Sequence, residues 1–255
     1  MRSRGSPTGW WTTYFDDVMG KALFTPASWE RAEKNADKVI ALLGLSRGAR
    51  VLDLACGNGR YAVALAARGV KSVGLDLALP YLADGRHIAA ERGAPAAFVR
   101  GDMRALPFRG AFDAALCVYT SFGYFPEDRD HVRVLREVAG ALKPGGRFLL
   151  DVMSREWVVR HFQAHDWSEV DGGHLLESRT SKLEEGRIEN TLLYLKGGQQ
   201  REYHHSVRVF TPMELRRMAQ EAGFAEVEIL ADLDRTPWTV DSPRTAVLAT
   251  KGAPG

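Results

Sequence analysis

The sequence predicts an α/β protein with a doubly wound, mostly parallel sheet of seven strands and an antiparallel β insertion. Three observations favour this fold. Short apolar segments alternate with helical segments over residues 50–152, the alternation stops over 154–210, and it resumes over 211–250. Strands that alternate with helices form βαβ units and a parallel sheet. Continuously apolar strands fit a sheet that is covered on both faces.

The composition is that of a globular protein. The chain has 255 residues, of which 45% are hydrophobic and 26% are charged, and its formal net charge is +2. A charge this close to zero argues against a dedicated nucleic-acid binder. The only two cysteines, Cys56 and Cys117, exclude a disulfide scaffold and a cysteine-rich zinc module, and predict a reducing, cytoplasmic location. No apolar run approaches the roughly 18 residues of a membrane span. We therefore expect neither nucleic acid nor a membrane as a partner.

The N-terminal segment 1–45 is predicted to form a lid and a helix. Residues 1–9 have no apolar stretch behind their two arginines, which favours a mobile tail over a signal peptide. The aromatic cluster at 10–15 must pack on another part of the chain, either as a lid over the ligand or simply on the sheet edge. A helix follows, which Thr25 can cap and which Gly44 should end.

Residues 46–153 are predicted to form the core of the sheet. The strands are short apolar runs, and the helices carry apolar residues at helical spacing. In chain order we expect strand 50–54, helix 60–68, strand 70–75, helix 79–92, strand 97–99, strand 112–118, helix 128–142, a turn at 143–146 and strand 147–152. Right-handed crossovers between such strands produce a doubly wound sandwich.

Residues 154–210 are predicted to form an insertion over the end of the sheet that supplies part of the substrate site. A short helix over 154–162 precedes three antiparallel strands at 174–183, 187–195 and 200–210, which are separated by glycine-containing turns. Exposed strands of this kind can pair between chains, so a homodimer through the insertion is an open alternative.

The segment 211–255 is predicted to complete the core sheet. A capping box at 211–214 starts a helix that ends at Gly223. Strands follow at 227–230 and 245–250. Their connection has no helical pattern, so the last strand should run antiparallel to its neighbours.

Three loops at the carboxyl ends of predicted strands carry the acidic residues Asp53, Asp76 and Asp102. Ligands of doubly wound sheets bind at this edge. Residues 57–62 satisfy the dinucleotide pattern G-x-G-x-x-G/A, so an NAD-dependent oxidoreductase is one alternative. Each acid taken alone is equally an ordinary turn or capping residue.

The position of Asp53 argues against a dinucleotide. A carboxylate at the start of the glycine loop repels a pyrophosphate and attracts an ammonium group. A ligand with an amino-acid head, a ribose and an adenine fits all three loops. Asp53 would face the ammonium, Asp76 the ribose hydroxyls and Asp102 the adenine amino group, while the N–H of Met103 would bond a ring nitrogen. S-adenosylmethionine is that ligand.

The sequence resembles the class I S-adenosylmethionine-dependent methyltransferases over about 53–152 and again over 211–250. The segments VLDLACGNGR, VGLDL, GDMRALPF and ALKPGGRFLLDV match the family's glycine-loop, ribose, adenine and fifth-strand motifs. The stretch 121–125 and the late insertion resemble the small-molecule branch. One departure is Ala55, where the family usually has glycine.

This resemblance implies a Rossmann-like fold, S-adenosylmethionine as the cofactor, S-adenosylhomocysteine as its product and a small-molecule acceptor. The expected cofactor site comprises Tyr14, Asp53, Ala55, Gly57, Gly59, Arg60, Asp76, Leu77, Asp102, Met103, Cys117 and Val118. The two cysteines are also typical of small buried apolar residues.

Methyl transfer from a sulfonium needs alignment and exclusion of water more than a catalytic dyad. Two residues are catalytic candidates. Tyr119 follows the fourth strand, beside the transferable methyl in this fold, where an aromatic face stabilises a sulfonium. His205 lies on the predicted strand 200–210 and is a base candidate, needed only if the acceptor carries a proton when it reacts. The expected substrate pocket comprises Trp11, Phe122, Tyr124, His204 and Arg208, and no metal site is expected.

We therefore predict S-adenosylmethionine-dependent methyl transfer to a nitrogen or oxygen of a small molecule in the cytoplasm. The alternatives are an NAD-dependent oxidoreductase, a tRNA or protein methyltransferase, and a non-enzymatic S-adenosylmethionine sensor. The near-neutral charge and the aromatic loop at 119–124 disfavour the second of these.

Overall fold

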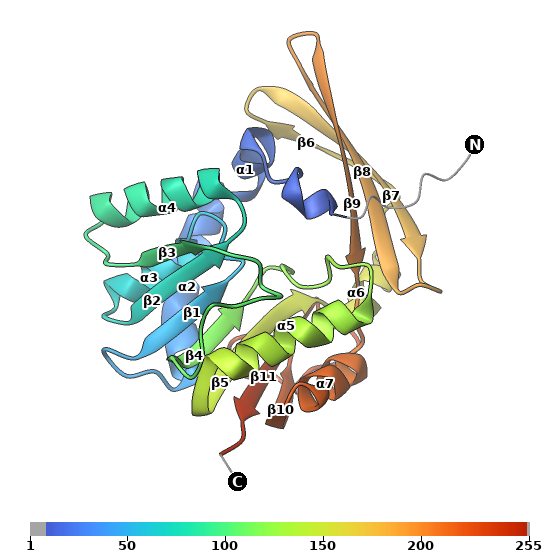
Figure 1. The fold of residues 1–255 in the computed structure, drawn as a ribbon. Helices are drawn as coiled ribbons and strands as arrows, with labels where there is room; N and C mark the ends of the chain where they lie inside the picture. Colours follow the sequence, from blue (N-terminus) through green and yellow to red (C-terminus); the bar gives the residue numbers. More distant parts are fainter. Residues whose placement is uncertain (1–8, 254–255) are drawn as a thin grey trace.

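The computed structural model describes residues 9–253, and Figure 1 shows their arrangement. The mobile tail expected at 1–9 lies outside the described residues except for Gly9. In chain order the elements are η1 (Trp10–Thr12), α1 (Asp17–Leu23), α2 (Pro26–Leu43), β1 (Arg50–Leu54), α3 (Arg60–Ala67), β2 (Lys71–Asp76), α4 (Leu79–Glu91), β3 (Ala97–Arg100), β4 (Phe112–Cys117), α5 (Asp128–Ala141), β5 (Leu142–Met153), α6 (Arg155–Arg160), β6 (His165–Val170), β7 (Gly173–Lys182), β8 (Arg187–Lys196), β9 (Gln199–Arg208), α7 (Pro212–Glu221), β10 (Phe224–Leu230) and β11 (Arg244–Lys251).

The core is a seven-stranded sheet with the order β10-β11-β5-β4-β1-β2-β3. Its neighbours pair in parallel except at β11, which is antiparallel to both β5 and β10. Residues of α2 and α3 pack on one face of the sheet, and residues of α5 and α7 pack on the other. The predicted doubly wound fold and its antiparallel last strand are therefore confirmed.

Local signals account for the ends of several helices. The Thr25 side chain accepts a hydrogen bond from the Ser28 N–H at the start of α2, and Gly44 ends that helix in the left-handed conformation at φ 64°. At the start of α7, Thr211 and Glu214 form the reciprocal capping box that the sequence indicates.

Residues 143–146 differ from the prediction, because they are not a separate turn but the irregular beginning of β5. The pairing of β5 with β4 shifts its register between Phe112 and Ala114, and Gly145 has φ 71°. A bulge of this kind admits extra residues without ending the strand.

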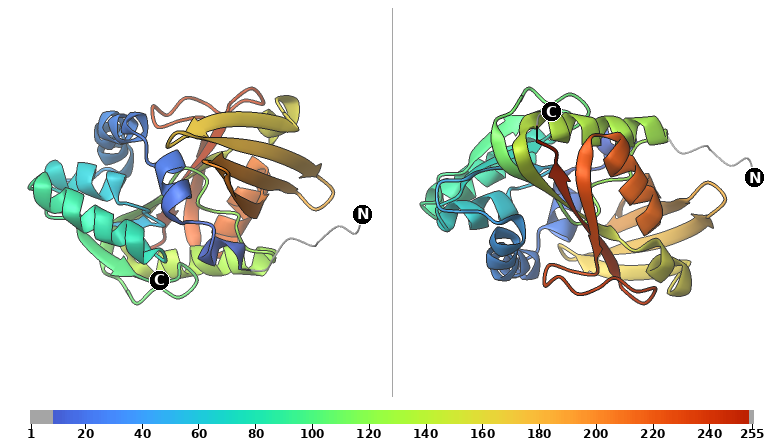
Figure 2. Two further views of the ribbon diagram at one scale, coloured as in Figure 1. Left: turned by 90° about the horizontal axis from the view of Figure 1, so that it is seen from above. Right: turned by 90° about the horizontal axis from the view of Figure 1, so that it is seen from below.

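The insertion forms a four-stranded antiparallel sheet in the order β6-β7-β8-β9, where three strands were expected. The inner face of this sheet packs on α1, where Val18 and Met19 join a cluster with Leu175, Leu192 and Tyr203. The view from above in Figure 2 places η1 and α1 between the core and this second sheet. Within residues 9–253, no helix combines the length and the apolarity of a membrane span.

Candidate active site

A cavity of about 960 Å³ lies at the carboxyl ends of the core strands. Its wall includes Asp53 near the end of β1, Asp76 at the end of β2 and Asp102 after β3. The N-terminal segment 10–24 and the inner face of β9 close the opposite side. Ligand pockets typically have volumes of about 300–1,000 Å³, so this cavity has room for a sizeable ligand.

Asp53 lies at the bottom of the cavity and is only 2% exposed. Its Oδ2 accepts a hydrogen bond of 3.1 Å from the Ala62 N–H in the first turn of α3. Burial raises the pKa of Asp53 to about 7, although this hydrogen bond and the charge of Arg60 oppose the shift. A carboxylate in this state gains most from a ligand that brings a positive charge.

Asp76 holds the glycine loop in place. Its Oδ2 accepts from the Gly57 N–H at 2.8 Å, and its Oδ1 accepts from the Ala78 N–H at 2.9 Å. Gly57 has φ 57°, and a Cβ atom there would lie 2.6 Å from the Phe24 ring. Ala55, which replaces the family's usual glycine, also has a left-handed φ of 54°, so the strained turn forms despite its side chain.

Asp102 is paired with Arg104, whose Nη2 donates to its Oδ2 at 2.7 Å. Burial opposes ionisation of Asp102, but the hydrogen bonds from Arg104 outweigh that effect and hold its pKa below the usual value. Met103, which follows it, also lines the cavity. The carboxylate is therefore ionised and available as an acceptor at neutral pH.

Three arginines converge on the Tyr119 ring at one end of the cavity. Their guanidinium carbons lie 4.4 Å (Arg60), 5.8 Å (Arg244) and 6.0 Å (Arg31) from the ring centroid. Within residues 9–253, neither Arg31 nor Arg60 forms a salt bridge. This end of the cavity therefore offers cationic charge to an anionic group of a ligand.

Tyr119 sits on a strained turn. Tyr119 and Thr120 both adopt left-handed φ values, of 58° and 60°. Asp151 on β5 supports the turn, because its Oδ2 accepts from the Tyr119 N–H at 3.2 Å and its backbone oxygen accepts from the Thr120 N–H at 3.0 Å. Arg244 donates to the same Oδ2 at 2.8 Å and so completes the support.

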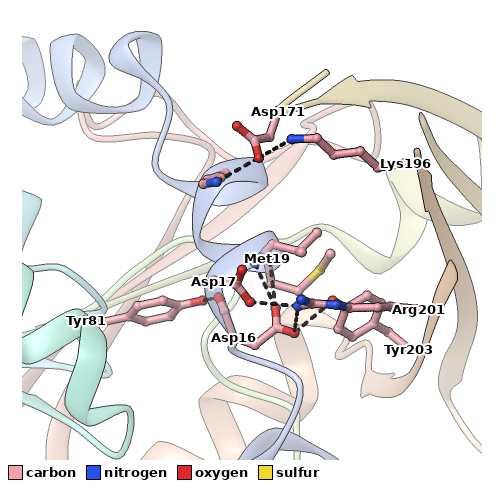
Figure 3. Close-up of polar contacts among 10 residues, drawn as sticks. Asp16, Asp17, Met19, Tyr81, Asp171, Lys196, Arg201 and Tyr203 are labelled. Carbon is pink, nitrogen blue, oxygen red and sulfur yellow. Dashed lines mark hydrogen bonds and ion pairs between the residues drawn. The ribbon is translucent and has the colours of Figure 1, made fainter. Parts of the chain in front are cut away.

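The N-terminal segment 10–24, which covers one side of the cavity and is called the lid below, is held in place through Asp16, the N-cap of α1 (Figure 3). Its Oδ1 accepts from the N–H groups of Val18 and Met19 at 3.0 and 3.1 Å. Its Oδ2 accepts from the Tyr203 hydroxyl on β9 at 2.8 Å, and its backbone oxygen accepts from the Tyr81 hydroxyl on α4 at 2.8 Å. Asp16 thus joins the lid to both the insertion and the core.

Ion pairs reinforce the contact between α1 and the insertion. Arg201 on β9 binds Asp17 at 2.8 Å. Asp171, between β6 and β7, binds Lys21 at 2.7 Å and Lys196 at 2.9 Å (Figure 3). The lid is therefore tied to the insertion at both ends of α1.

An aromatic recess, formed by Trp10, Tyr14, Tyr124 and His205, lines another part of the cavity. The His205 ring centroid lies 5.0 Å from that of Tyr14 and 5.5 Å from that of Trp10, and Trp10 lies 4.8 Å from Tyr124. Burial lowers the pKa of His205 to about 4, with a smaller opposing effect from Glu177. The imidazole is therefore uncharged at neutral pH.

Three residues expected at the site do not line the cavity. Gly59 does not line the cavity but caps the N-terminus of α3 at φ 75°. Cys117 is fully buried in the hydrophobic core beneath the sheet edge, as the alternative structural interpretation held. Phe122 is buried in the same core against Phe210 and His131.

Two residues expected in the substrate pocket point elsewhere. His204 faces away from the cavity, where its ring contacts Thr191 and Glu202. Arg208 binds Glu214 at 2.6 Å, so its charge is already matched. The remaining predicted residues line the cavity, namely Trp11, Tyr14, Asp53, Ala55, Gly57, Arg60, Asp76, Leu77, Asp102, Met103, Val118, Tyr119, Tyr124 and His205.

Comparisons with known proteins agree with this geometry. Residues 51–146 match the family model of the methyltransferase domain. The Bacillus subtilis (strain 168) protein YqeM, a methyltransferase by name, is 27% identical over 208 residues, which cover 79% of this chain and 84% of that protein.

Two solved structures extend the likeness to the insertion. The CcbJ methyltransferase from Streptomyces caelestis has a TM-score of 0.80 at 21% identity, and the match covers 96% of this chain and 99% of that one. CalS10, an amino pentose methyltransferase from Micromonospora echinaspora solved with S-adenosylmethionine bound, has a TM-score of 0.63 at 25% identity, covering 88% and 92%. The methyltransferase domain matched over residues 51–146, the shared fold and the three carboxylates on one cavity make the chain similar to the class I S-adenosylmethionine-dependent methyltransferases and argue against an NAD-dependent oxidoreductase.

Proposed function

We propose that this enzyme transfers the methyl group of S-adenosylmethionine to an amine nitrogen of a small molecule. The observation that carries this proposal is the aromatic recess, which holds an uncharged histidine and no strong base. An alcohol must lose its proton to become a good nucleophile, whereas a neutral amine already has a lone pair. The likeness to CalS10, an amino pentose methyltransferase, supports an amino group as the acceptor.

The residues of the cavity fit the cofactor. Asp76 and Asp102 are acceptors for the ribose hydroxyls and the adenine amino group, and Asp53 complements an ammonium. The arginines Arg31 and Arg60, which form no salt bridge in the described part of the chain, complement a carboxylate. When bound, the cofactor supplies a methyl group attached to a positively charged sulfur. The group that leaves this methyl carbon is a neutral thioether.

The chain's own contribution is to bind, orient and exclude water. The lid fastened at Asp16 closes the cavity, and the Tyr119 ring offers an aromatic face to the sulfonium. The nitrogen lone pair forms the new N–C bond as the C–S electron pair passes to sulfur. The product is then an ammonium, whose proton leaves to water.

His205 is too weak a base for that proton, in contrast to the base role considered from the sequence. Its pKa is about 4, whereas an alkylammonium such as that of lysine has a pKa of about 10. The difference of about 6 units corresponds to about 8 kcal/mol against the transfer. We therefore assign His205 the role of a hydrogen-bond acceptor that orients an N–H of the acceptor.

The cellular location and the oligomeric state of the enzyme are also proposals. Both cysteines are free and buried, which suits a reducing cytoplasm. On the outer face of the insertion, Trp167 is 62% exposed beside Leu176, which is 40% exposed and its partner in the β6–β7 register. This apolar pair favours a homodimer through the second sheet.

The proposed function is tested with radiolabelled S-adenosylmethionine and matched acceptors, namely methyl glycosides that carry a primary, secondary or tertiary amine or only hydroxyls. We expect label in the primary and secondary amines, and much less when Asp76→Ala replaces the wild type. Label in the hydroxyl compounds alone, or in bulk tRNA or protein but in none of the glycosides, would overturn the proposal.

A further inference from the structure

Two buried polar atoms without hydrogen-bond partners lie on neighbouring strands of the insertion sheet. Asn190 on β8 and His205 on β9 are directly paired in the antiparallel register. Within residues 9–253, Asn190 Oδ1 and His205 Nδ1 are both buried and make no hydrogen bond. Opposed residues in such a pair have their Cβ atoms about 4.5–5.5 Å apart, so the two side chains are neighbours on the inner face of the sheet.

The orientation of the Asn190 amide is fixed by Glu177 on β7. Asn190 Nδ2 donates to Glu177 Oε2 at 2.9 Å, and Arg179 Nη2 donates to the same oxygen at 2.6 Å. A carboxylate only accepts hydrogen bonds, so the NH₂ of Asn190 must face Glu177. Its Oδ1 is consequently left as an acceptor on the side away from Glu177.

The two unpartnered atoms are complementary only in one protonation form of the histidine. Asn190 Oδ1 can only accept, so His205 satisfies it by carrying its proton on Nδ1. A small side-chain rotation or one bridging water then joins the two atoms. Because Nδ1 is buried while the residue lines the cavity, the opposite edge of the ring, which carries Nε2, reaches the cavity.

We propose that Asn190 is a positioning residue that fixes His205 as the Nδ1–H tautomer, so that an unprotonated Nε2 faces the methyl acceptor. This inference rests on the proposed transfer to an amine. Nε2 then accepts an N–H of the amine and leaves the nitrogen lone pair free to attack. In the other tautomer, Nε2–H would donate to that same lone pair and block it.

A hydrogen bond to Nε2 also restricts which amines can be acceptors. Orientation by Nε2 requires at least one N–H, so primary and secondary amines are oriented and tertiary amines are not. Methylation should therefore stop at the tertiary amine, and no quaternary ammonium product should form.

The tautomer is measured by nitrogen NMR on the full-length protein with ¹⁵N-labelled histidine and bound S-adenosylhomocysteine, and the His205 signals are assigned with His205→Gln. We expect only the Nδ1–H form in the wild type. Asn190→Leu should shift His205 toward the Nε2–H form. Glu177→Gln should give a mixture, because a glutamine can either donate to or accept from the Asn190 amide.

The matched control is Thr191→Val, the next residue of β8, whose hydroxyl contacts His204 Nδ1 at 3.0 Å on the opposite face. It should change the His204 signals and leave those of His205 unchanged. An Nε2–H form in the wild type, or a pure Nδ1–H form in a folded Asn190→Leu or Glu177→Gln variant, would overturn the role of Asn190. This readout needs no methyl transfer, so it fails or succeeds independently of the amine assay.

Discussion

Replacing Asp53 by asparagine should make the empty enzyme more stable while it weakens cofactor binding. The Asn side chain keeps an oxygen for the Ala62 N–H but cannot ionise. Burial raises the pKa of Asp53 from 3.8 to about 7 in the folded protein. A shift of about 3 units corresponds to about 4 kcal/mol, which is the free energy lost when the buried carboxyl ionises in the folded state.

The raised pKa of Asp53 determines how its contribution to stability changes with pH. The contribution of Asp53 to wild-type stability is fully present below pH 3.8 and is lost as the pH rises to about 7. The free energy of unfolding, measured by urea titration, should therefore be higher for Asp53→Asn than for the wild type. The difference should be about 4 kcal/mol at pH 8 and under about 2 kcal/mol at pH 5.

Binding should change in the opposite direction. Calorimetry with S-adenosylhomocysteine at pH 8 should show a loss of roughly 10- to 100-fold for the variant, which is the size of a lost hydrogen bond to a charged group. Wild-type affinity should rise between pH 6 and 8 as Asp53 ionises. A variant no more stable than the wild type at pH 8, or one that binds equally well, would refute the assignment of Asp53 to the ammonium.

Four further substitutions test other parts of the account. Asp76→Ala should weaken S-adenosylhomocysteine binding by at least about 10-fold in calorimetry, through the lost ribose and loop contacts; an unchanged affinity would remove Asp76 from the site. Tyr119→Ala should lower turnover more than cofactor affinity, and equal losses would make Tyr119 a binding residue only. Tyr203→Phe should speed hydrogen exchange of the amides in α1 by roughly 10- to 100-fold, because Asp16 loses a charged hydrogen bond; unchanged protection would show that this contact does not hold the lid. Trp167→Glu should turn a dimer into a monomer in sedimentation velocity, and a monomeric wild type would reject the dimer.

Much of the core could be predicted because its signals are local. The alternation of apolar runs with helical spacing predicted the succession of the core strands and helices along the chain, and Thr25, Gly44 and Thr211 mark helix ends through hydrogen bonds within their own turns. The placement of Asp53 and Asp76 in one cavity follows from a general property of parallel sheets, in which the carboxyl ends of strands meet at one edge.

The elements that were missed depend on contacts between distant residues. β6 is an edge strand whose first five residues are exposed, so it carries no apolar pattern. α1 is too short to show a helical period and is held by packing on Leu175 and Tyr203, more than 150 positions later. No pattern in the sequence could show that α2 and β11 bring Arg31 and Arg244 to the same tyrosine.

For His204 and His205, the sequence pattern predicts one feature of their placement, and the packing of the fold decides the other. Strand alternation predicts that His204 and His205 lie on opposite faces of β9. Only the packing of α1 against the insertion decides that His205 faces the cavity and His204 faces outward.

The central claim is that the three strand-end carboxylates hold an amino acid joined to adenosine. Calorimetric titration of the wild type with S-adenosylmethionine, and separately with NAD⁺, tests it most directly. We expect S-adenosylmethionine to bind at one site per chain, with the affinity falling in Asp53→Asn and Asp76→Ala, and NAD⁺ to give no binding heat. Binding of NAD⁺ without binding of S-adenosylmethionine would contradict the account.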